Sequence, residues 1–283
     1  QLLLKSKLSI FYFIMAIYDC FQFFDEEHIL DLRLNILNKF VDFFVIVEST
    51  TNHQGVTKKL NYNSNKFKKF NSKIIYIVVD DTENSIKKKH LWGESLVEQH
   101  QRNAITRGLK NCHDNDLIIM SDVDEIPNLD QLKMFDKKNK YAVFEQKMFN
   151  YKINLINETE INWHGSKLCL KKNFKSPQWL RDLKFKKYPF WRLDKPKNLQ
   201  IIQNGGWHFA YLQSPENIAK KIKSFSHGEF NKIEYINTRN IEEKIKMKKD
   251  IFERQISYKK VEIDDSFPEY IINNKEKLKD WII

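Results

Sequence analysis

Three carboxylates are crowded together at the end of an apolar run in this chain. The run from Leu117 to Met120 is typical of a strand buried on both faces, as in a parallel or mixed α/β sheet. Asp122, Asp124 and Glu125 follow it at once, and such a cluster repels itself unless a cation lies among its members. Because ligands of open α/β sheets bind beyond the carboxyl ends of strands, the Asp-x-Asp pattern predicts a divalent cation holding a phosphorylated ligand. An acidic turn exposed to water is the alternative interpretation.

The composition is that of a folded globular protein. With 283 residues the chain forms one large domain or one domain with an appendage. Its hydrophobic content of 41% and aromatic content of 13% exclude general disorder. Only 7 Gly and 6 Pro argue against a loop-dominated β-protein or a collagen-like chain.

The net charge of +11 does not by itself indicate a nucleic-acid partner. The lysines are scattered in short groups, with no basic block of five or more, so they are typical of solvated faces. We therefore expect no nucleic acid among the partners. A basic surface attracts anionic sugar nucleotides, and it also permits peripheral contact with an acidic membrane.

The cysteines and the first residues give no sign of a disulfide framework or a membrane span. Cys20, Cys112 and Cys169 form no Cys-x-x-Cys pair, and we expect Cys20 and Cys112 to be buried thiols. The apolar run over residues 8–18 is too short to cross a bilayer. We expect it to lead into the first core strand, in a protein that is cytoplasmic or peripheral to a membrane; the end of a signal or anchor sequence is the alternative.

Strand and helix patterns alternate as far as Pro127. We expect strands over residues 17–24, 43–47, 73–79 and 117–120, and helices over 26–40 and 94–109. This order predicts a mostly parallel central sheet with helices on both faces, and the ends of its strands form the ligand edge.

Beyond Pro127 the patterns change. Strands over 141–154 and 167–170 are expected to add mixed or antiparallel pairs, and helices are expected over 215–225 and 240–257. The predicted organisation is a lead segment over 1–16, a catalytic domain over 17–213, and a mainly helical C-terminal extension over 214–283 packed on the same domain.

A series of short motifs runs through the chain in a fixed order. They are Ile17-Tyr18-Asp19-Cys20-Phe21, Glu27 to Leu34, Val41 to Glu48, Gly55-x-x-Lys58, Trp92-Gly93-Glu94, Gln101-Arg102, Ser121 to Pro127, Gly206-Trp207-His208, Lys223 to Glu229, and Phe267 to Tyr270. The chain thereby resembles glycosyltransferase family 17, whose best-known members are β-1,4-mannosyl-glycoprotein N-acetylglucosaminyltransferases. The resemblance implies a GT-A-type fold, a UDP-sugar donor, a divalent metal and inversion at the anomeric carbon. The long stem and membrane anchor of the animal enzymes are not evident in this chain, which leaves the glycan acceptor open.

The resemblance also implies roles for the acidic cluster. Asp124 would coordinate Mn²⁺ or Mg²⁺, Asp122 would bind the ribose or complete the metal shell, and Glu125 would hold a cation such as Arg102. His208 is the expected further ligand, which favours Mn²⁺ because imidazole binds it better than Mg²⁺. The alternative for His208 is a hydrogen-bonded histidine beneath the neighbouring aromatic residues.

An inverting transfer also needs a base that takes the proton of the acceptor hydroxyl. We select Glu229, because Gly228 before it lets the backbone bring a carboxylate close to a sugar. Asp182 and Glu145 are the competing candidates. For each of the three, a carboxylate in a surface ion pair is the alternative.

Donor contacts are expected from the ends of the early strands. Glu48, Ser49 and Lys58 border the loop where the nucleobase and ribose would lie. Arg102 has the planar fork that suits a diphosphate, and its spacing also permits an i,i+4 pair with Glu98.

The sequence thus predicts a metal-dependent inverting glycosyltransferase that moves a sugar, expected to be GlcNAc, from a UDP-sugar to a glycan hydroxyl. An inactive, carbohydrate-binding relative is one alternative. A nucleotidyl- or phosphotransferase is another, although the chain has neither G-x-x-x-x-G-K-[ST] nor G-x-G-x-x-G.

Overall fold

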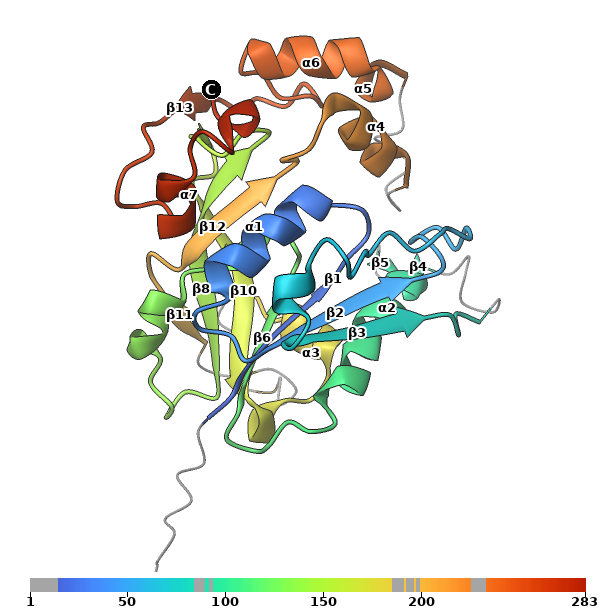
Figure 1. Cartoon of the computed structure of the whole chain (residues 1–283), viewed down its shortest axis with the longest axis vertical. Coiled ribbons are helices and arrows are strands. Elements are labelled where there is room, and N and C mark those ends of the chain that lie inside the picture. Colours follow the sequence, from blue (N-terminus) through green and yellow to red (C-terminus); the bar gives the residue numbers. More distant parts are fainter. Residues whose placement is uncertain are drawn as a thin grey trace, which may run out of the picture.

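A mixed sheet forms the centre of the protein (Figure 1). The computed structural model describes residues 15–83, 90–91, 94–184, 191, 196, 199–224 and 233–283. The main path of the sheet runs β13-β9-β8-β10-β6-β1-β2-β3, with β7, β11 and β12 joined beside it. Its strands are β1 (Ile17–Gln22), β2 (Phe43–Ser49), β3 (Ile74–Val79), β6 (Leu117–Ser121), β7 (Glu125–Pro127), β8 (Tyr141–Asn150), β9 (Leu155–Asn157), β10 (Asn162–Leu170), β11 (Gln200–Ile202), β12 (Gly206–Ala210) and β13 (Tyr258–Lys260).

The N-terminal half of the sheet is parallel, as expected. The strands β3, β2, β1 and β6 pair side by side in the same direction, so their carboxyl ends meet at one edge. Phe44 and Ile46 of β2 pack into one core cluster, and Val45 and Val47 pack into another. This alternation shows that both faces of the strand are buried, which explains its continuous apolar run.

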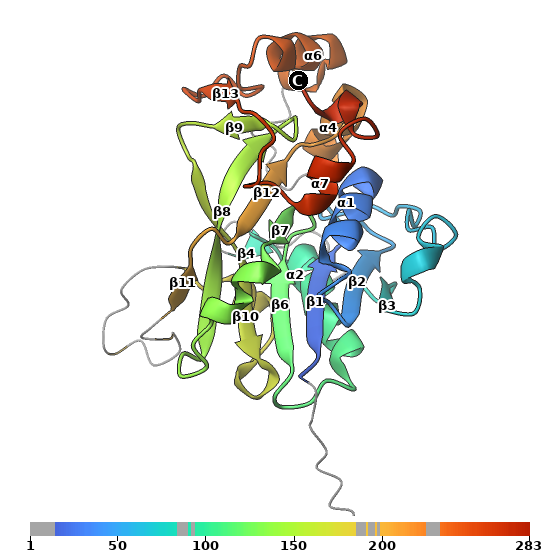
Figure 2. The ribbon, with the colours of Figure 1, turned by 60° about the vertical axis from the view of Figure 1, so that its left-hand side comes forward.

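The second half of the sheet brings distant segments to the same edge. The strands β10 and β8 continue from β6 in antiparallel pairs, which confirms the mixed additions beyond Pro127 (Figure 2). The strand β12 pairs parallel with β8 and antiparallel with β7. In these registers His208 lies opposite Met148 on one side and Glu125 on the other. The pairing of β12 with β7 therefore places His208 next to the loop of residues 122–125, which we call the acidic loop.

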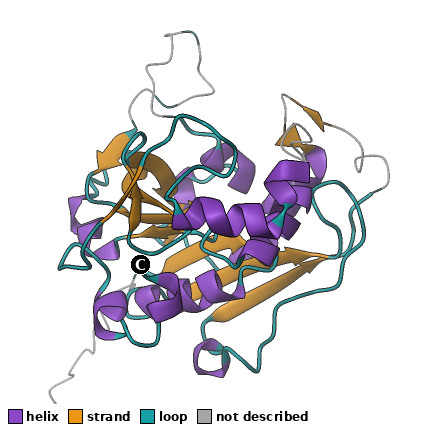
Figure 3. Ribbon diagram, turned by 90° about the horizontal axis from the view of Figure 1, so that it is seen from above, coloured by secondary structure: helices purple, strands orange, loops and turns teal. Residues whose placement is uncertain are grey.

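Helices accompany the sheet and complete its core (Figure 3). They are α1 (Glu27–Leu37), α2 (Leu96–Asn103), α3 (Pro177–Arg181), α4 (Pro215–Ser224), α5 (Ile233–Ile236), α6 (Thr238–Lys246) and α7 (Glu269–Asn273), with 3-10 turns over Lys68–Phe70, Ala104–Leu109, Leu129–Met134, Lys171–Asn173 and Lys279–Trp281. A separate two-stranded ladder joins β4 (His90–Leu91) to β5 (Glu94–Ser95).

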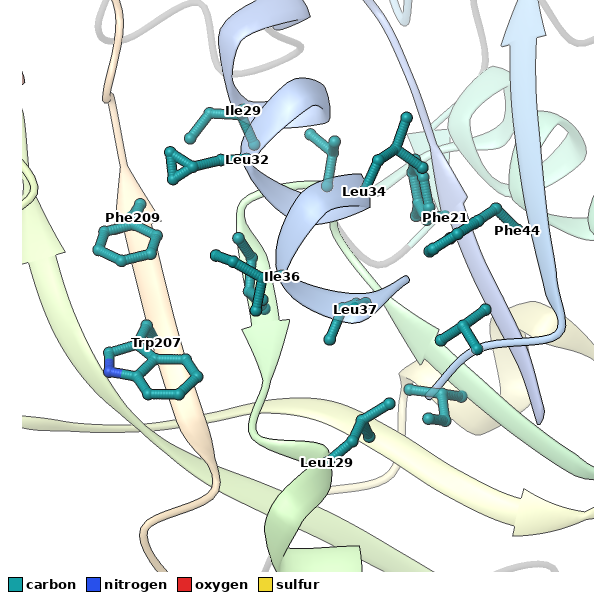
Figure 4. Packing of buried hydrophobic residues seen from close by; sticks show 14 of the residues in the cluster. Phe21, Ile29, Leu32, Leu34, Ile36, Leu37, Phe44, Leu129, Trp207 and Phe209 are labelled. Atoms are coloured by element: carbon teal, nitrogen blue, oxygen red, sulfur yellow. The ribbon is translucent and has the colours of Figure 1, made fainter. Parts of the chain in front are cut away.

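The helix α1 covers one face with its apolar stripe. Ile29 and Leu32 lie beside Phe209 of β12, whereas Leu34 lies near Phe21 of β1 (Figure 4). The helices α4, α5 and α6 gather beyond the end of β12 (Figure 1), around a cluster of their own that includes Ile218.

Several expected elements end earlier than predicted, most clearly one strand and one helix. The strand expected over 141–154 stops at Asn150, and Tyr151 has a positive φ of 64°. The helix expected over 240–257 stops at Lys246, because buried Asp250 accepts hydrogen bonds from Tyr258 and Arg254 at 3.0 and 2.8 Å. These non-local contacts outweigh helix propensity.

The expected helix over 94–109 is also divided. It consists of α2 and of the 3-10 turn Ala104–Leu109. Cys20 and Cys169 are buried and Cys112 is partly buried, each as a free thiol. Among the described residues, every helix is too short or too polar to cross a membrane.

Candidate active site

The loop after β6 is held from behind by a buried arginine. Arg33 of α1 donates from one guanidinium nitrogen to the backbone oxygens of Asp122, Val123 and Glu125, at 3.2, 3.3 and 2.7 Å. Its remaining nitrogens donate to both carboxylate oxygens of Asp19 on β1, at 2.7 and 2.5 Å. Because the arginine is anchored on α1 and β1, the acidic loop is fixed to the core.

Arg181 of α3 neutralises two of the three carboxylates. It reaches both oxygens of Asp122, at 3.3 and 2.6 Å, and Oε1 of Glu125 at 3.1 Å. Trp163 Nε1 donates to the same Oε1 at 2.7 Å. Burial opposes ionisation of Asp122, but the guanidinium groups of Arg181 and Arg102 outweigh it and hold the pKa of Asp122 well below its usual value.

Glu125 holds a cation, as expected, but this cation is Arg181 and not Arg102. Arg102 instead pairs with Glu98 at 2.5 Å, donates to Gln178 at 2.5 Å, and lies 3.9 Å from Asp122. Arg181 takes the expected place beside Glu125, because α3 packs against the end of β6. Arg102 therefore forms the i,i+4 ion pair with Glu98 and also lies close to Asp122, at the edge of the sheet where the ligand is expected.

Asp124 and His208 face each other. His208 Nε2 lies 3.6 Å from Asp124 Oδ1, and the two side chains are 11% and 13% exposed. His208 Nδ1 is buried without a hydrogen-bond partner among the described residues. Burial would lower the pKa of His208, but Asp124, Glu125 and Asp122 together raise it. Burial would raise the pKa of Asp124, but Lys221 and His208 together lower it.

These two side chains fit a metal ion. Two ligands, each about 2 Å from one ion, lie at most about 4 Å apart, and the observed separation falls within that span. A carboxylate oxygen with an imidazole nitrogen suits Mn²⁺. Among the described residues no group of three or more His, Cys, Asp or Glu side chains is arranged for a metal. Phosphate oxygens and water would have to complete the shell.

A lysine that no sequence pattern indicated lies beside Asp124 and His208. Lys221 of α4 places its Nζ 3.7 Å from Asp124 Oδ2 and 3.1 Å from Glu26 Oε1. No motif distinguishes it from the other lysines of α4. Its position depends on how α4 packs across the strand ends, which only the tertiary structure gives.

A cavity of ≈ 410 Å³ opens in front of these residues. It lies between the ends of the parallel strands and the segment that follows β12. Six residues predicted for donor or metal binding line it, namely Ser49, Lys58, Arg102, Asp122, Asp124 and His208. The structure thus brings together most of the predicted binding residues.

Glu48 lies behind the cavity. Its carboxylate is fully buried and accepts hydrogen bonds from Lys58 Nζ at 2.5 Å, Tyr76 Oη at 2.8 Å, and the backbone N–H groups of Asn61 and Tyr62 at 2.7 and 3.0 Å. The structure thus makes Glu48 an anchor for the loop that carries Lys58.

The carboxylates selected as candidate bases are separated from this cavity or lie outside the described residues. Glu145 of β8 lies 3.7 Å from His164, and Asp182 accepts a hydrogen bond from Gln178 at 2.8 Å. Neither lines the cavity. Glu229 belongs to the segment 225–232, which is outside the described residues.

Comparison with known proteins gives a family and a few distant structures. The sequence model of glycosyltransferase family 17 matches residues 12–277. No curated protein matches the chain. A crystal structure of a mycobacterial protein is 14% identical with a TM-score of 0.26, over 48% of this chain and 41% of that one.

Two further structures are of glucosyl-3-phosphoglycerate synthase from Mycobacterium tuberculosis. The complex with Mn²⁺, UDP-glucose and glycerol 3-phosphate is 14% identical with a TM-score of 0.26, over 48% of this chain and 44% of that one. The complex with Mn²⁺, UDP and phosphoglyceric acid is 12% identical with a TM-score of 0.32, over 67% of this chain and 69% of that one. The chain thus spans less than half of two of the three structures. The family match, with the mixed sheet and its flanking helices, confirms the GT-A-type α/β fold expected from the sequence.

Proposed function

The chain belongs to glycosyltransferase family 17, and we propose that it is a metal-dependent, inverting transferase that moves a hexose from UDP to a glycan hydroxyl. GlcNAc is the hexose that we propose. The observation that carries the proposal is the approach of Asp124 and His208 to 3.6 Å in a cavity that Lys58, Arg102 and Lys221 also line. Carboxylate and imidazole ligands beside several cations suit a divalent metal and a diphosphate.

The metal site in this proposal consists of Asp124 and His208. A bound Mn²⁺ would offset the negative charge that develops on the departing UDP. Arg33 fixes the loop of Asp124 from the core, so the carboxylate is oriented before any ligand arrives. Asp122 is already neutralised by Arg181, so we assign it to ribose binding and to orienting the loop.

The diphosphate would lie among the cations of the cavity. Lys221 approaches Asp124 from α4, and Arg102 approaches Asp122 from α2. Both side chains are largely buried, at 14% and 8% exposed. A charged hydrogen bond is stronger when water is excluded, so these two cations are the proposed contacts of the leaving group. Lys58, held by Glu48, and Ser49 remain the proposed contacts of the nucleoside.

The proposed base is Glu229. The helix α4 brings Lys221 to the cavity, and Glu229 follows it eight positions later in the chain. Glu145 and Asp182 do not line the cavity. The base would take the proton of the acceptor hydroxyl as that oxygen attacks the anomeric carbon and UDP leaves.

A screen of UDP-sugars tests this function. Each donor is incubated with the protein and Mn²⁺, with and without EDTA, and released UDP is measured. We expect release from at least one donor, its loss with EDTA, and its loss in Asp124→Asn. The exposed Asp130 provides the matched control Asp130→Asn, which should retain the activity. Undiminished activity in Asp124→Asn, or failure of the parent protein to bind UDP, would contradict the proposal.

A further inference from the structure

Besides His208, a second buried side chain of the cavity has a hydrogen-bonding group without a partner among the described residues. Asn150, the last residue of β8, is 2% exposed. Its Oδ1 has no hydrogen-bond partner among the described residues. Buried amide oxygens are nearly always paired, because an unpaired one loses its bonds to water without replacement. The oxygen is therefore free to accept a hydrogen bond from a group that the described residues do not supply.

Asn154 provides a contrast four residues further along the chain. It is also 2% exposed, but its Nδ2 donates to the backbone oxygens of Val261 and Ile283, both at 3.0 Å. Its Oδ1 accepts from the backbone N–H of Ile283 at 3.0 Å. These hydrogen bonds explain the burial of Asn154. No comparable hydrogen bond within the described residues explains the burial of Asn150 Oδ1.

The strand register places Asn150 one step beyond the proposed metal ligand. In the parallel pair of β8 and β12, Met148 lies opposite His208 and Asn150 lies opposite Ala210. All four residues line the cavity. Alternate residues of a strand share a face, and two residues span about 7 Å along it. Asn150 is thus displaced from the level of His208 by roughly the width of a sugar ring, toward the ends of the strands.

Two residues that follow His208 in the chain shape the cavity wall near Asn150. Ala210 lies beside Asn150 on the neighbouring strand, and its small side chain leaves room next to the side chain of Asn150. Tyr211, which follows Ala210, also lines the cavity and has a positive φ of 54°. An aromatic residue rarely adopts this conformation, and it turns the chain away from β12 at the cavity wall.

We propose that Asn150 recognises the sugar that is transferred, with its Oδ1 accepting a hydrogen bond from a hydroxyl or an acetamido N–H of the hexose on UDP. This inference rests on the proposed function, because the diphosphate at Asp124 and His208 sets where the hexose begins. It assigns Asn150 to sugar recognition and leaves nucleotide and metal binding to other residues.

The test compares UDP with UDP-sugars in Asn150→Leu. Leucine has nearly the shape of asparagine but forms no hydrogen bond. Dissociation constants for UDP, UDP-GlcNAc, UDP-glucose and UDP-galactose are measured by calorimetry with Mn²⁺. For at least one sugar, we expect the affinity relative to UDP to fall about 3- to 10-fold, while UDP itself changes less than about 2-fold. Because the replaced oxygen has no hydrogen-bond partner in the described part of the chain, the melting temperature should not fall. The donor that responds identifies the substituent: UDP-GlcNAc alone indicates the acetamido group, and all three indicate a shared hydroxyl.

The same substitution at Asn154 is the matched control. Asn154→Leu leaves three backbone groups unpaired, so it should lower the melting temperature and leave the ratio of sugar to UDP affinity unchanged. Asn150→Ala is measured in parallel, so that a folding defect of one variant does not decide the result. Unchanged ratios for all three sugars in a folded Asn150 variant that still binds UDP would overturn this inference alone. A parent protein that binds no UDP would overturn the proposed function, and this inference with it.

Discussion

Arg33 and Asp19 form an ion pair in which both side chains are completely shielded from solvent, with Arg33 Nη2 2.5 Å from Asp19 Oδ1. The same guanidinium also holds three backbone oxygens of the acidic loop. The pair therefore links α1 and β1 to the segment that carries Asp124. Its charge lies behind the site and contributes to the orientation of the loop.

Removing one partner of this pair should be costly. Asp19→Asn keeps the shape of the side chain but leaves the guanidinium without its counter-charge, so we expect the free energy of unfolding to fall by about 3–5 kcal/mol. Urea unfolding measures the loss. The exposed pair of Lys39 and Glu269, whose side chains are 55% and 74% exposed, is the control, and Lys39→Met should cost less than about 1 kcal/mol. Equal losses in the two variants would show that Asp19 has no special structural role.

Two adjacent lysines of α4 are predicted to differ in function. Lys221 is 14% exposed and lies near Asp124, whereas Lys220 is 57% exposed and pairs with Asp25 at 2.7 Å. We expect Lys221→Met to weaken Mn²⁺-dependent UDP binding about 10-fold or more, because it removes a shielded charge from the proposed diphosphate site. Lys220→Met should change binding less than about 2-fold. Calorimetry measures UDP affinity in both variants. Similar losses of affinity at the two positions would refute the assignment of Lys221 to the diphosphate site.

The base is tested by Glu229→Gln, which retains hydrogen bonding but removes basicity. Turnover with a glycan acceptor should fall about 10²- to 10⁴-fold, while UDP affinity stays nearly unchanged. Glu145→Gln and Asp182→Asn are the controls, and both should keep most of the activity because neither residue lines the cavity. If one of the controls loses turnover and Glu229→Gln does not, that residue is the base.

His28 should make the stability depend on pH. It stacks on Trp281, with ring centroids 4.2 Å apart, and burial lowers its pKa from 6.5 to about 4. Between these values the unfolded chain binds a proton that the folded protein does not, so stability should decline as the pH falls below about 6.5. The contribution of one such group is at most about 1.4 kcal/mol per pH unit.

His28→Phe isolates this contribution, because phenylalanine can still stack on Trp281 but does not titrate. The variant should therefore gain stability relative to the parent protein as the pH is lowered from 7 to 4.5. A difference in unfolding free energy that is constant over this range would exclude the predicted shift.

Local patterns were enough to predict the parts of the site that lie on strand ends. The run from Leu117 and the carboxylates after it are contiguous in the sequence, and the parallel strands that flank them have equally strong apolar runs. Ser49 ends a parallel strand and Lys58 lies in the loop that follows it, so both were expected at the carboxyl edge of the sheet, where they line the cavity.

Residues that reach the site from other elements were beyond such patterns. Arg181 and Lys221 contact the acidic loop only because α3 and α4 pack across the strand ends, and no local signal sets them apart from other cations. Glu48 has the position expected of a ligand-binding residue at a strand end, but three hydrogen bonds from one loop and a fourth from Tyr76 of β3 turn its carboxylate inward. In each case non-local packing decides where the side chain goes.

The central claim, that Asp124 and His208 hold the metal of a UDP-sugar site, is tested most directly by anomalous diffraction from crystals grown with Mn²⁺ and UDP. We predict one manganese peak bonded to a carboxylate oxygen of Asp124 and to Nε2 of His208, each at about 2 Å, with the diphosphate completing the shell. A structure with UDP bound in the cavity and manganese absent from these two side chains, or bound elsewhere, would contradict the claim.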